Sequence, residues 1–391
     1  MSDITDMAGR TGVAAASGEP DALAAGATTR ERLDRYVALI GPMAMIAALL
    51  LIMLILEPTR YFRLSNFDII LKDAALYMPM AMAMTLVICT RGIDLSIGSV
   101  AALTAIVMAY MVKSFGFPWW VAVPLAISLG ALCGLVNGLI ITRLKVPDLI
   151  GTLAMDLAYR GFALVLAKGV VLSRFPEEIV AIGRGEIPGF VAIPVVIGLS
   201  TVLVGYVIYT RTRLGRYALA IGSNPEAAEL TGIPVDRYKV YVYVLMGAMA
   251  GLAGVMLAGK LNAVQATSAP FFNLHVIAAV VVGGTSLFGG RGSIVGSLAG
   301  VLLLSMMINA LVTLRIEFFW QSVASGAVII ASVAFYTWLQ KADRDGSGGL
   351  ASRLATPEAR RMLRFIALLF AITGALFLLG WLFAGETTAV R

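Results

Sequence analysis

The chain of 391 residues is 59% hydrophobic and only 14% charged, whereas soluble globular domains contain about 25% charged residues. This composition excludes an ordinary soluble domain and indicates an integral membrane protein. The formal net charge of +7 does not indicate nucleic-acid binding, because the basic residues are dispersed between apolar runs and form no continuous basic face.

Residues 1–35 are predicted to form a disordered tail on the cytoplasmic side of the membrane. Small and polar residues dominate the start of this tail and show no apolar period. No apolar run of the kind found in secretory signals precedes the first predicted span, 36–56. Arg30, Arg32 and Arg35 lie just before that span and hold the N-terminus inside by the positive-inside rule.

The second apolar run, 74–90, leads into a polar interruption that reads Arg-Gly-Ile-Asp-Leu-Ser-Ile-Gly-Ser and contains Arg91, Asp94, Ser96 and Ser99. Irregular backbone within a membrane is tolerated only where protein buries it or where it lines water. One interpretation is therefore a broken helix whose polar groups line a translocation path. The alternative is a tight cytoplasmic turn with both charged side chains in solvent.

A third span is predicted over 97–111, and a fourth, over 121–141, carries glycines at four-residue spacing on one helix face. Such glycines allow the backbone of a neighbouring helix to approach closely, so a packing role is expected. Asn137 lies beside them and can either hydrogen-bond across that interface or face the path. The glycines of this face are Gly130, Gly134 and Gly138.

The fifth predicted span, 147–167, contains Asp156 and Arg160 at i, i+4 spacing, where opposite charges can meet. Such a pair either neutralises itself or lines a permeation path. Residues 169–190 form the largest predicted outer loop, whose mixed charge can receive a soluble binding protein.

The longest polar insert, which we call the coupling segment, is 211–239. It follows a span predicted over 191–210 and precedes one over 240–258. Its sequence predicts a capped helix of about two turns, far too short to cross a bilayer. In that helix Asn224 caps, Pro225 and Glu226 suit the first turn, Ala227, Ala228 and Leu230 continue it, and Gly232 ends it.

Five cations flank this helix and place the coupling segment in the cytoplasm. A short helix held at the cytoplasmic face can serve as a docking site for another protein. The alternative is an ordinary loop with a helical turn. The flanking cations are Arg211, Arg213, Arg216, Arg237 and Lys239.

The run from Gly254 to Leu261 almost matches the phosphate-binding P-loop. Leu261 replaces the Ser or Thr that would hold magnesium, and an apolar helix rather than a strand precedes the run. We therefore reject ATP binding here. Together with Gly247 and Gly251, the run is interpreted as another helix-packing face. The single histidine, His275, cannot by itself form a His-based metal cluster.

A second glycine-rich break, 283–292, follows a span predicted over 276–283. The residues after the two breaks, 97–103 and 295–301, agree in character at every position. Duplicated halves with interrupted membrane segments are a common transporter plan, so we expect an internal repeat. Gly296 and Gly300 are assigned to helix packing.

Spans are also predicted over 293–314 and 318–339. A polar linker, 341–359, precedes an additional C-terminal membrane segment, 360–391, with an apolar run long enough to cross. The predicted fold is an all-α, polytopic transmembrane bundle with broken helices. It has about ten core spans in a permease domain, 36–340, and one extra C-terminal span.

Three stretches together resemble the permease subunits of ribose-, xylose- and galactose-type ABC importers, and the resemblance extends over 36–340. They lie at 91–100, 278–300 and in the coupling segment. In that family a Gly-x-Asn-x-x-Ala-Ala-x-x-x-Gly-Ile pattern contacts the ATPase subunit. The matching residues here are Gly222, Asn224, Ala227, Ala228, Gly232 and Ile233.

The resemblance implies a bacterial inner-membrane permease that translocates a monosaccharide or polyol, without enzymatic activity or a cofactor of its own. It implies an ABC ATPase, a periplasmic sugar-binding protein and a second permease, in a homodimer or heterodimer. The family pattern has ten spans, so the eleventh is a departure. The alternative is an ion-coupled secondary transporter or channel that uses Asp94 or Asp156. Path residues are assigned as Arg91, Asp94, Ser96, Ser99, Asn137 and Asn309.

Overall fold

The computed structural model describes residues 29–187 and 191–316, and the isolated positions 323, 326, 327, 330, 361 and 364, with side chains from residue 41 onward. The chain divides into two units, Met1–Val37 and Ala38–Arg391. The described part of the first unit is the beginning of helix α1 (Thr29–Leu56). The other described elements lie in the second unit.

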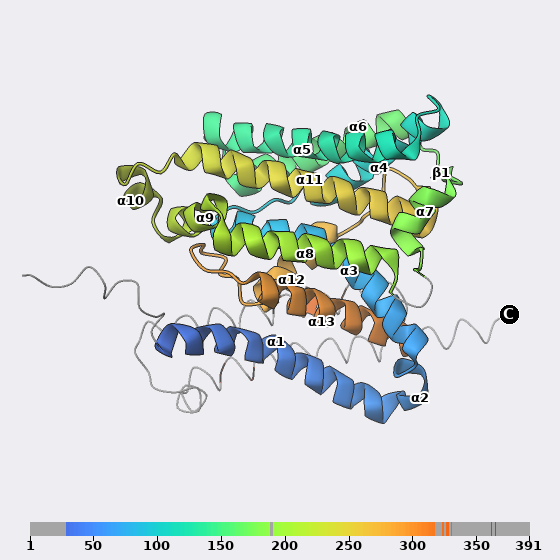
Figure 1. Cartoon of the computed structure of the whole chain (residues 1–391), viewed down its shortest axis with the longest axis horizontal. Helices are drawn as coiled ribbons and strands as arrows, with labels where there is room; N and C mark the ends of the chain where they lie inside the picture. The colour runs from blue at the N-terminus through green and yellow to red at the C-terminus, as the bar shows by residue number, and fades with distance from the viewer. Residues whose placement is uncertain are drawn as a thin grey trace, which may run out of the picture. The chain divides into compact units, whose positions relative to one another are not determined.

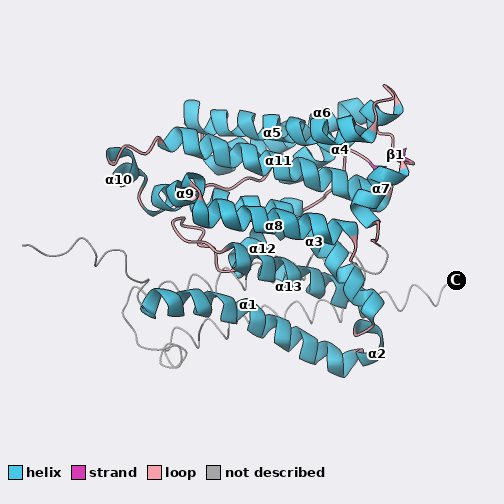
Figure 2. Ribbon diagram, viewed as in Figure 1, coloured by secondary structure: helices cyan, strands magenta, loops and turns pink. Residues whose placement is uncertain are grey.

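The described part of the second unit is almost entirely helical (Figures 1 and 2). Its strands, β1 (Leu172–Ser173) and β2 (Ala263–Val264), pair antiparallel. Among the described residues, six helices are long and apolar enough to cross a membrane: α3 (Leu64–Cys89), α5 (Trp119–Arg143), α6 (Asp148–Ala167), α8 (Ile193–Arg211), α11 (Val235–Leu261) and α13 (Ile294–Thr313). The shorter helices are α2 (Pro58–Tyr61), α4 (Ile97–Lys113), α7 (Glu177–Arg184), α9 (Arg213–Ser223), α10 (Pro225–Leu230) and α12 (Phe272–Val282).

The predicted all-helical membrane architecture is confirmed, and the predicted number of spans is not. The third and eighth predicted spans correspond to α4 and α12, which have only 17 and 11 residues. The predicted span at 318–339 and the C-terminal segment 360–391 fall almost entirely outside the described residues, as do the linker and residues 1–28 of the N-terminal tail. Residues 29–35 of that tail, predicted to be disordered, are helical and form the start of α1.

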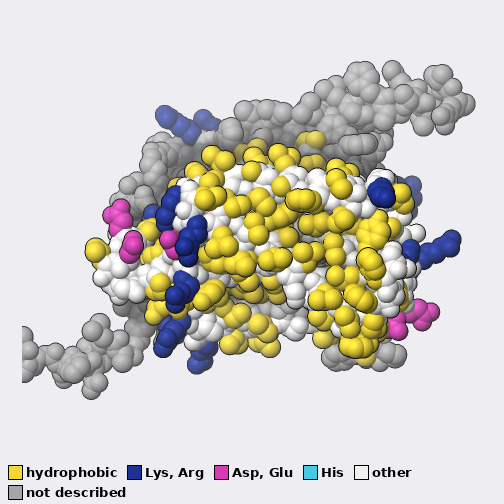
Figure 3. Space-filling model, turned by 90° about the horizontal axis from the view of Figure 1, so that it is seen from above, with side chains coloured by type: hydrophobic (Ala, Val, Ile, Leu, Met, Phe, Trp, Pro, Cys, Tyr) yellow, Lys and Arg dark blue, Asp and Glu magenta, His cyan; other side chains and the backbone are white. Residues whose placement is uncertain are grey.

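Hydrophobic side chains cover the middle of the face shown in Figure 3, and lysine and arginine side chains gather at one end of it. An apolar belt between charged ends is the surface expected of helices that cross a bilayer. We call the end that carries α9 and α10 the α10 end, and the end that carries α7 the α7 end (Figure 1).

Glycines bring α5 and α11 into direct backbone contact along the pair (Figure 1). A Cβ atom added at Gly134 would lie 2.0 Å from the carbonyl oxygen of Tyr243, and one added at Gly247 would lie 2.1 Å from that of Gly130. No side chain fits between the two backbones at these points. Glycine is required here because the helices touch, which fixes the start of α11 against α5.

The P-loop-like run lies within α11 and is helical throughout. Gly254 packs against the carbonyl oxygen of Ala101 on α4. Lys260 forms an ion pair with Asp73 of α3. The run is therefore a packing face with a salt bridge at its end and has no phosphate-binding loop geometry.

Two non-helical segments meet inside the bundle. Residues 90–96, which we call the break segment, connect α3 to α4, and residues 262–271 connect α11 to α12. The side chain of Asn273 donates to the carbonyl oxygen of Leu95 at 3.0 Å. A Cβ atom added at Gly98 would lie 2.8 Å from the carbonyl oxygen of Ala269. The two segments thus pack closely, and each is followed by a short helix.

Candidate functional site

Helix α10 has the capped form that its sequence predicts. The Asn224 side chain accepts a hydrogen bond from the Ala227 amide at 3.0 Å, and Pro225 occupies the first turn. Gly232 follows the helix with a φ of +83°, which a residue with a Cβ atom adopts only with strain. Both ends of α10 are therefore fixed by local residues.

Helix α9, which precedes α10 in the coupling segment, was not predicted from the sequence. Leu214, Ala218 and Ile221 recur at helical spacing and supply the signal. Ala218 and Ile221 are fully buried against the membrane helices. The coupling segment is thus two helices rather than one short helix in a loop.

The predicted coupling residues divide into two groups. Gly222 and Ala228 are buried, and a Cβ atom added at Gly222 would lie 1.7 Å from the carbonyl oxygen of Cys89 at the end of α3. Leu230, in contrast, is 89% exposed. Asn224, Glu226, Ala227 and Gly232 are also exposed, and Pro225 and Ile233 are half-buried.

Arg91 points toward α9 and away from the interior. Its Nε donates to the carbonyl oxygen of Gly222 at 2.7 Å, and its Nη2 donates to that of Ser223 at 2.8 Å. These carbonyls lie at the C-terminus of α9, where a positive charge also complements the helix dipole. Nearby, the amide of Gly290 donates to the carbonyl oxygen of Cys89 at 3.0 Å. The glycine-rich break 283–292 and the end of α3 therefore meet beside α9.

Asp94 points inward and is 1% exposed. Its Oδ1 accepts hydrogen bonds from the amide and hydroxyl of Ser96 at 2.9 and 2.7 Å. Its Oδ2 lies 3.5 Å from the Nδ2 of Asn137, which donates to the Ser96 hydroxyl at 2.8 Å. In the described part of the chain its partners are Ser96, at the N-terminus of α4, and Asn137 of α5, rather than a cation, and the N-terminus of α4 favours a negative charge.

The interruption after α3 is therefore a buried break, and the alternative with both charges in solvent is wrong for Asp94. Of the predicted path residues, Asp94, Ser96, Ser99 and Asn137 come together. Ser99 donates to the carbonyl oxygen of Ser96 at 2.8 Å. Asn309 lies elsewhere and exchanges two hydrogen bonds of 2.9 Å with Asn66.

Tyr159 belongs to the same polar network, although the sequence analysis did not select it. Its hydroxyl contacts the Asn137 side chain at 3.1 Å and the carbonyl oxygen of Cys133 at 2.9 Å. The sequence contains one indication of this role: Tyr159 lies within a predicted membrane helix, and a buried phenol requires a hydrogen-bond partner. The next residue, Arg160, donates to the carbonyl oxygens of Ala266 and Ser268, both at 2.8 Å, and so braces segment 262–271 rather than closing on Asp156.

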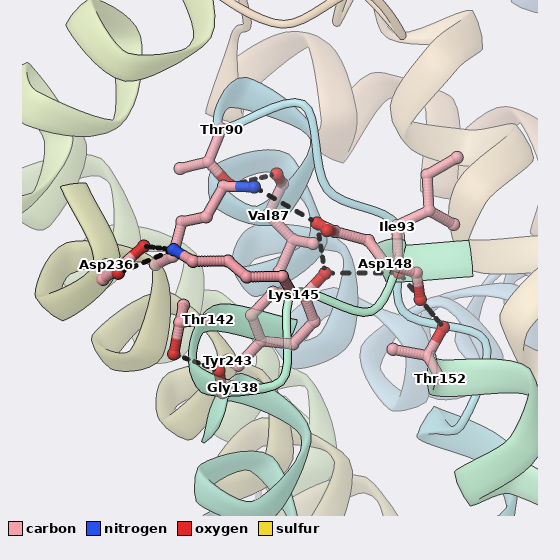
Figure 4. A network of polar contacts seen from close by, with 11 residues as sticks. Val87, Thr90, Ile93, Gly138, Thr142, Lys145, Asp148, Thr152, Asp236 and Tyr243 are labelled. Carbon is pink, nitrogen blue, oxygen red and sulfur yellow. Dashed lines mark hydrogen bonds and ion pairs between the residues drawn. The ribbon is translucent and has the colours of Figure 1, made fainter. Parts of the chain in front are cut away.

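A second polar cluster joins the break segment to the starts of α6 and α11 (Figure 4). The Tyr243 hydroxyl donates to Asp148 Oδ2 at 2.9 Å and lies 3.4 Å from the carbonyl oxygen of Ile93. The Lys239 ammonium is 3.6 Å from the same carboxylate. The Thr152 hydroxyl accepts from the Leu95 amide at 3.1 Å and contacts the carbonyl oxygen of Asp148 at 2.9 Å.

The chain has clear relatives among known proteins. Residues 66–333 match the family described as "Branched-chain amino acid transport system / permease component". The ribose import permease protein of Escherichia coli (strain K12) is 39% identical over 296 residues, which cover 74% of this chain and 91% of that protein. The ribose import permease protein of Bacillus subtilis (strain 168) is 37% identical over 306 residues, 78% of this chain and 94% of that protein.

The fructose import permease protein of Rhizobium meliloti is 35% identical over 294 residues, which cover 72% of this chain and 80% of that protein. No solved structure shows a significant match. The resemblance inferred from the three sequence stretches is confirmed by matches that span most of each relative. The chain therefore belongs to this family of ABC importer permeases, which are membrane-embedded transport subunits rather than enzymes.

Proposed function

We propose that this chain is the permease subunit of an ATP-driven importer for a monosaccharide or polyol. In this proposal a periplasmic binding protein delivers the cargo, and a separate ATPase docks on α10. The relatives named for ribose and fructose import support this class of cargo. The relatives do not support the alternative of an ion-coupled transporter that uses Asp94 or Asp156.

The exposed side chain of Leu230 is the observation that carries the docking proposal. Leu230 is 89% exposed on a polar segment that lies beyond the apolar belt, so lipid does not cover it. Exposed apolar side chains on a rigid element are typical anchors of protein interfaces. The fixed ends of α10 keep this anchor in one orientation, which lowers the entropy lost on binding. Exposed Glu226, Asn224 and Ala227 would surround it.

The polar network around Asp94 is the proposed part of the translocation path. Carboxylate, hydroxyl and amide groups at membrane depth suit a cargo rich in hydroxyl groups. These side chains are buried in the present conformation, so the break segment must shift before cargo reaches them. Asn309 and Arg91 are separate from this network, and Arg91 contacts the coupling segment instead.

The proposed topology has ten core spans, one extra C-terminal span and a cytoplasmic N-terminus. The α10 end would then face the cytoplasm, because exposed Arg211, Arg213 and Arg216 lie there. The working importer would contain two permeases, either two copies of this chain or this chain and a homologue.

Replacing Leu230 with Asp tests the docking proposal. We expect the affinity of the permease for its ATPase subunit to fall by about 30-fold, because an interface hot spot contributes about 2 kcal/mol. The measurement is titration of labelled ATPase onto the permease in nanodiscs. Leu64→Asp is the matched control, since Leu64 is 87% exposed and lies at the α7 end of α3. Unchanged affinity in Leu230→Asp would refute docking through α10.

A further inference from the structure

The break segment is held on two sides by residues that belong to, or directly follow, the coupling segment. On one side it contacts the C-terminus of α9, which precedes α10. On the other side it contacts the start of α11, which follows α10. The break segment itself leads into Asp94 and α4. It therefore lies between the proposed ATPase-docking helix and the proposed translocation path.

The contact with α9 is made by Arg91. Its guanidinium spans the carbonyl oxygens of Gly222 and Ser223, with donor–acceptor distances of 2.7 and 2.8 Å. Hydrogen bonds from a charged donor are roughly twice as strong as neutral ones. The absence of a side chain at Gly222 lets α9 pack directly on the carbonyl oxygen of Cys89. Movement of α9 must therefore displace the start of the break segment or break these bonds.

The contact with α11 is made by Tyr243 and Asp148. Tyr243 is fully buried, and its hydroxyl lies between the Asp148 carboxylate and the carbonyl oxygen of Ile93 (Figure 4). Lys239, the last residue of the coupling segment, lies beside the same carboxylate. Thr152, one turn along α6 from Asp148, accepts the amide of Leu95. The middle of the break segment is thus tied to the beginning of α6 and, through Tyr243, to the third turn of α11.

Both contacts converge on a few residues of backbone that continue into the buried network. The carbonyl oxygen of Leu95 accepts a hydrogen bond from the Asn273 side-chain amide, and the Asp94 carboxylate accepts one from the backbone amide of Ser96 at the start of α4. The segment is only seven residues long and is bonded at several points, so it has little freedom to absorb a displacement. A shift imposed at either contact is passed on to Asp94 and α4.

We propose that Arg91 and the Asp148–Tyr243 pair are positioning residues that transmit movement of the coupling segment to the break segment. This proposal rests on the proposed function, because it takes the ATPase to be the source of that movement. The two contacts act as a clamp: when the ATPase moves α9 and α10, the clamp shifts the break segment and opens the polar network around Asp94.

Amide hydrogen exchange tests this clamp without knowledge of the cargo. The sample is the complete permease–ATPase complex in nanodiscs, with and without ATP and vanadate. In the wild type, we expect the exchange rate of peptides covering 90–96 to change by about fivefold or more, the range of typical coupling energies. In Arg91→Ala and Tyr243→Phe, peptides of the coupling segment should still respond, while the response at 90–96 falls below about twofold.

Arg91→Lys retains the positive charge but cannot span both carbonyl oxygens. We therefore expect an exchange response at 90–96 between those of the wild type and Arg91→Ala, which a variant that merely failed to fold would not give. The matched control is Lys145→Ala combined with Asp236→Ala. This ion pair lies beside the cluster, but its side chains are 72% and 54% exposed, and it makes no hydrogen bond to the described break segment. The control should behave as the wild type.

The outcomes also separate this proposal from ATPase docking. If ATPase binding leaves the amide exchange rate of α10 unchanged, docking through α10 is wrong. The ATPase is then not shown to move the coupling segment through α10, and the proposed function fails at this point. If α10 responds but 90–96 responds equally in the wild type and in both clamp variants, docking stands and the clamp is refuted. An unresponsive 90–96 segment in the wild type also refutes the clamp.

Discussion

Asp94 and Arg91 are three residues apart, and their side chains serve different parts of the molecule. The carboxylate is buried and meets donors at the start of α4, while the guanidinium reaches the end of α9. A buried carboxylate without a cation is stable only when several donors satisfy it. Ser96 and Asn137 supply these donors. At the residue scale, the polar interruption therefore separates into a buried network and a contact with the coupling segment.

Asp94→Asn should destabilise the permease although the side chain keeps its shape. The amide has one oxygen where the carboxylate has two, so it cannot accept from both Ser96 and Asn137, and one buried donor loses its partner. We expect a loss of about 1–3 kcal/mol in unfolding free energy, measured as a lower thermal unfolding midpoint of the purified permease. Asp236→Asn, at an exposed ion pair, is the control and should change little. Equal midpoints for the two variants would contradict the assigned network.

At the scale of elements, backbone contact between α5 and α11 determines where the second polar cluster forms. Gly134 packs on the carbonyl oxygen of Tyr243, the residue whose hydroxyl reaches Asp148. The short helices α4 and α12 follow non-helical segments, and α12, with 11 residues, is far shorter than the about 20 residues that a membrane span needs. These segments place polar backbone inside the bundle, where neighbouring side chains must satisfy it.

Gly134→Ala tests the α5–α11 contact. The added methyl group would lie 2.0 Å from the carbonyl oxygen of Tyr243, so the helices must separate. We expect the unfolding free energy to fall by about 1–3 kcal/mol, as for other overpacked sites. Gly161→Ala is the matched control, because Gly161 lies within α6 and a Cβ atom there meets no atom within 4 Å. That control should be neutral or slightly stabilising, since alanine favours a helix over glycine. An equally stable Gly134→Ala protein would show that the helices do not touch at this point.

At the scale of the whole molecule, the arrangement separates the proposed docking helix α10 from the proposed translocation path. Leu230 lies at the α10 end in solvent, and the Asp94 network lies inside the bundle. A permease whose ATP is hydrolysed on another subunit requires a mechanical connection between these places. The break segment connects them, because Arg91 bonds to the end of α9 and lies three residues before Asp94 in the chain.

Cysteine labelling tests the proposed orientation of this arrangement. Cys89 and Cys133 are buried, so they should react little with a membrane-impermeant maleimide. Ser114→Cys, in the exposed turn between α4 and α5, should be labelled in intact spheroplasts. Leu230→Cys should be labelled only after lysis, because the cations of the coupling segment hold it in the cytoplasm. The reverse pattern would invert the topology and exclude ATPase docking at α10.

The amino-acid sequence by itself determined the membrane class, the six long apolar helices of the described residues, the capped helix α10 and the family. Each of these depends on local signals: apolar length, the cap formed by Asn224 and Gly232, and motifs that are contiguous in the chain. Only the tertiary structure decided that Arg91 reaches α9, that Tyr159 joins Asn137, and that Tyr243 meets Asp148. The Arg91–Gly222 and Tyr243–Asp148 pairs are far apart in the chain, and Tyr159 and Asn137 lie on different helices. No local sequence pattern encodes any of these contacts. They arise because close-packed glycine faces bring particular helices together and leave each buried polar group only a few partners.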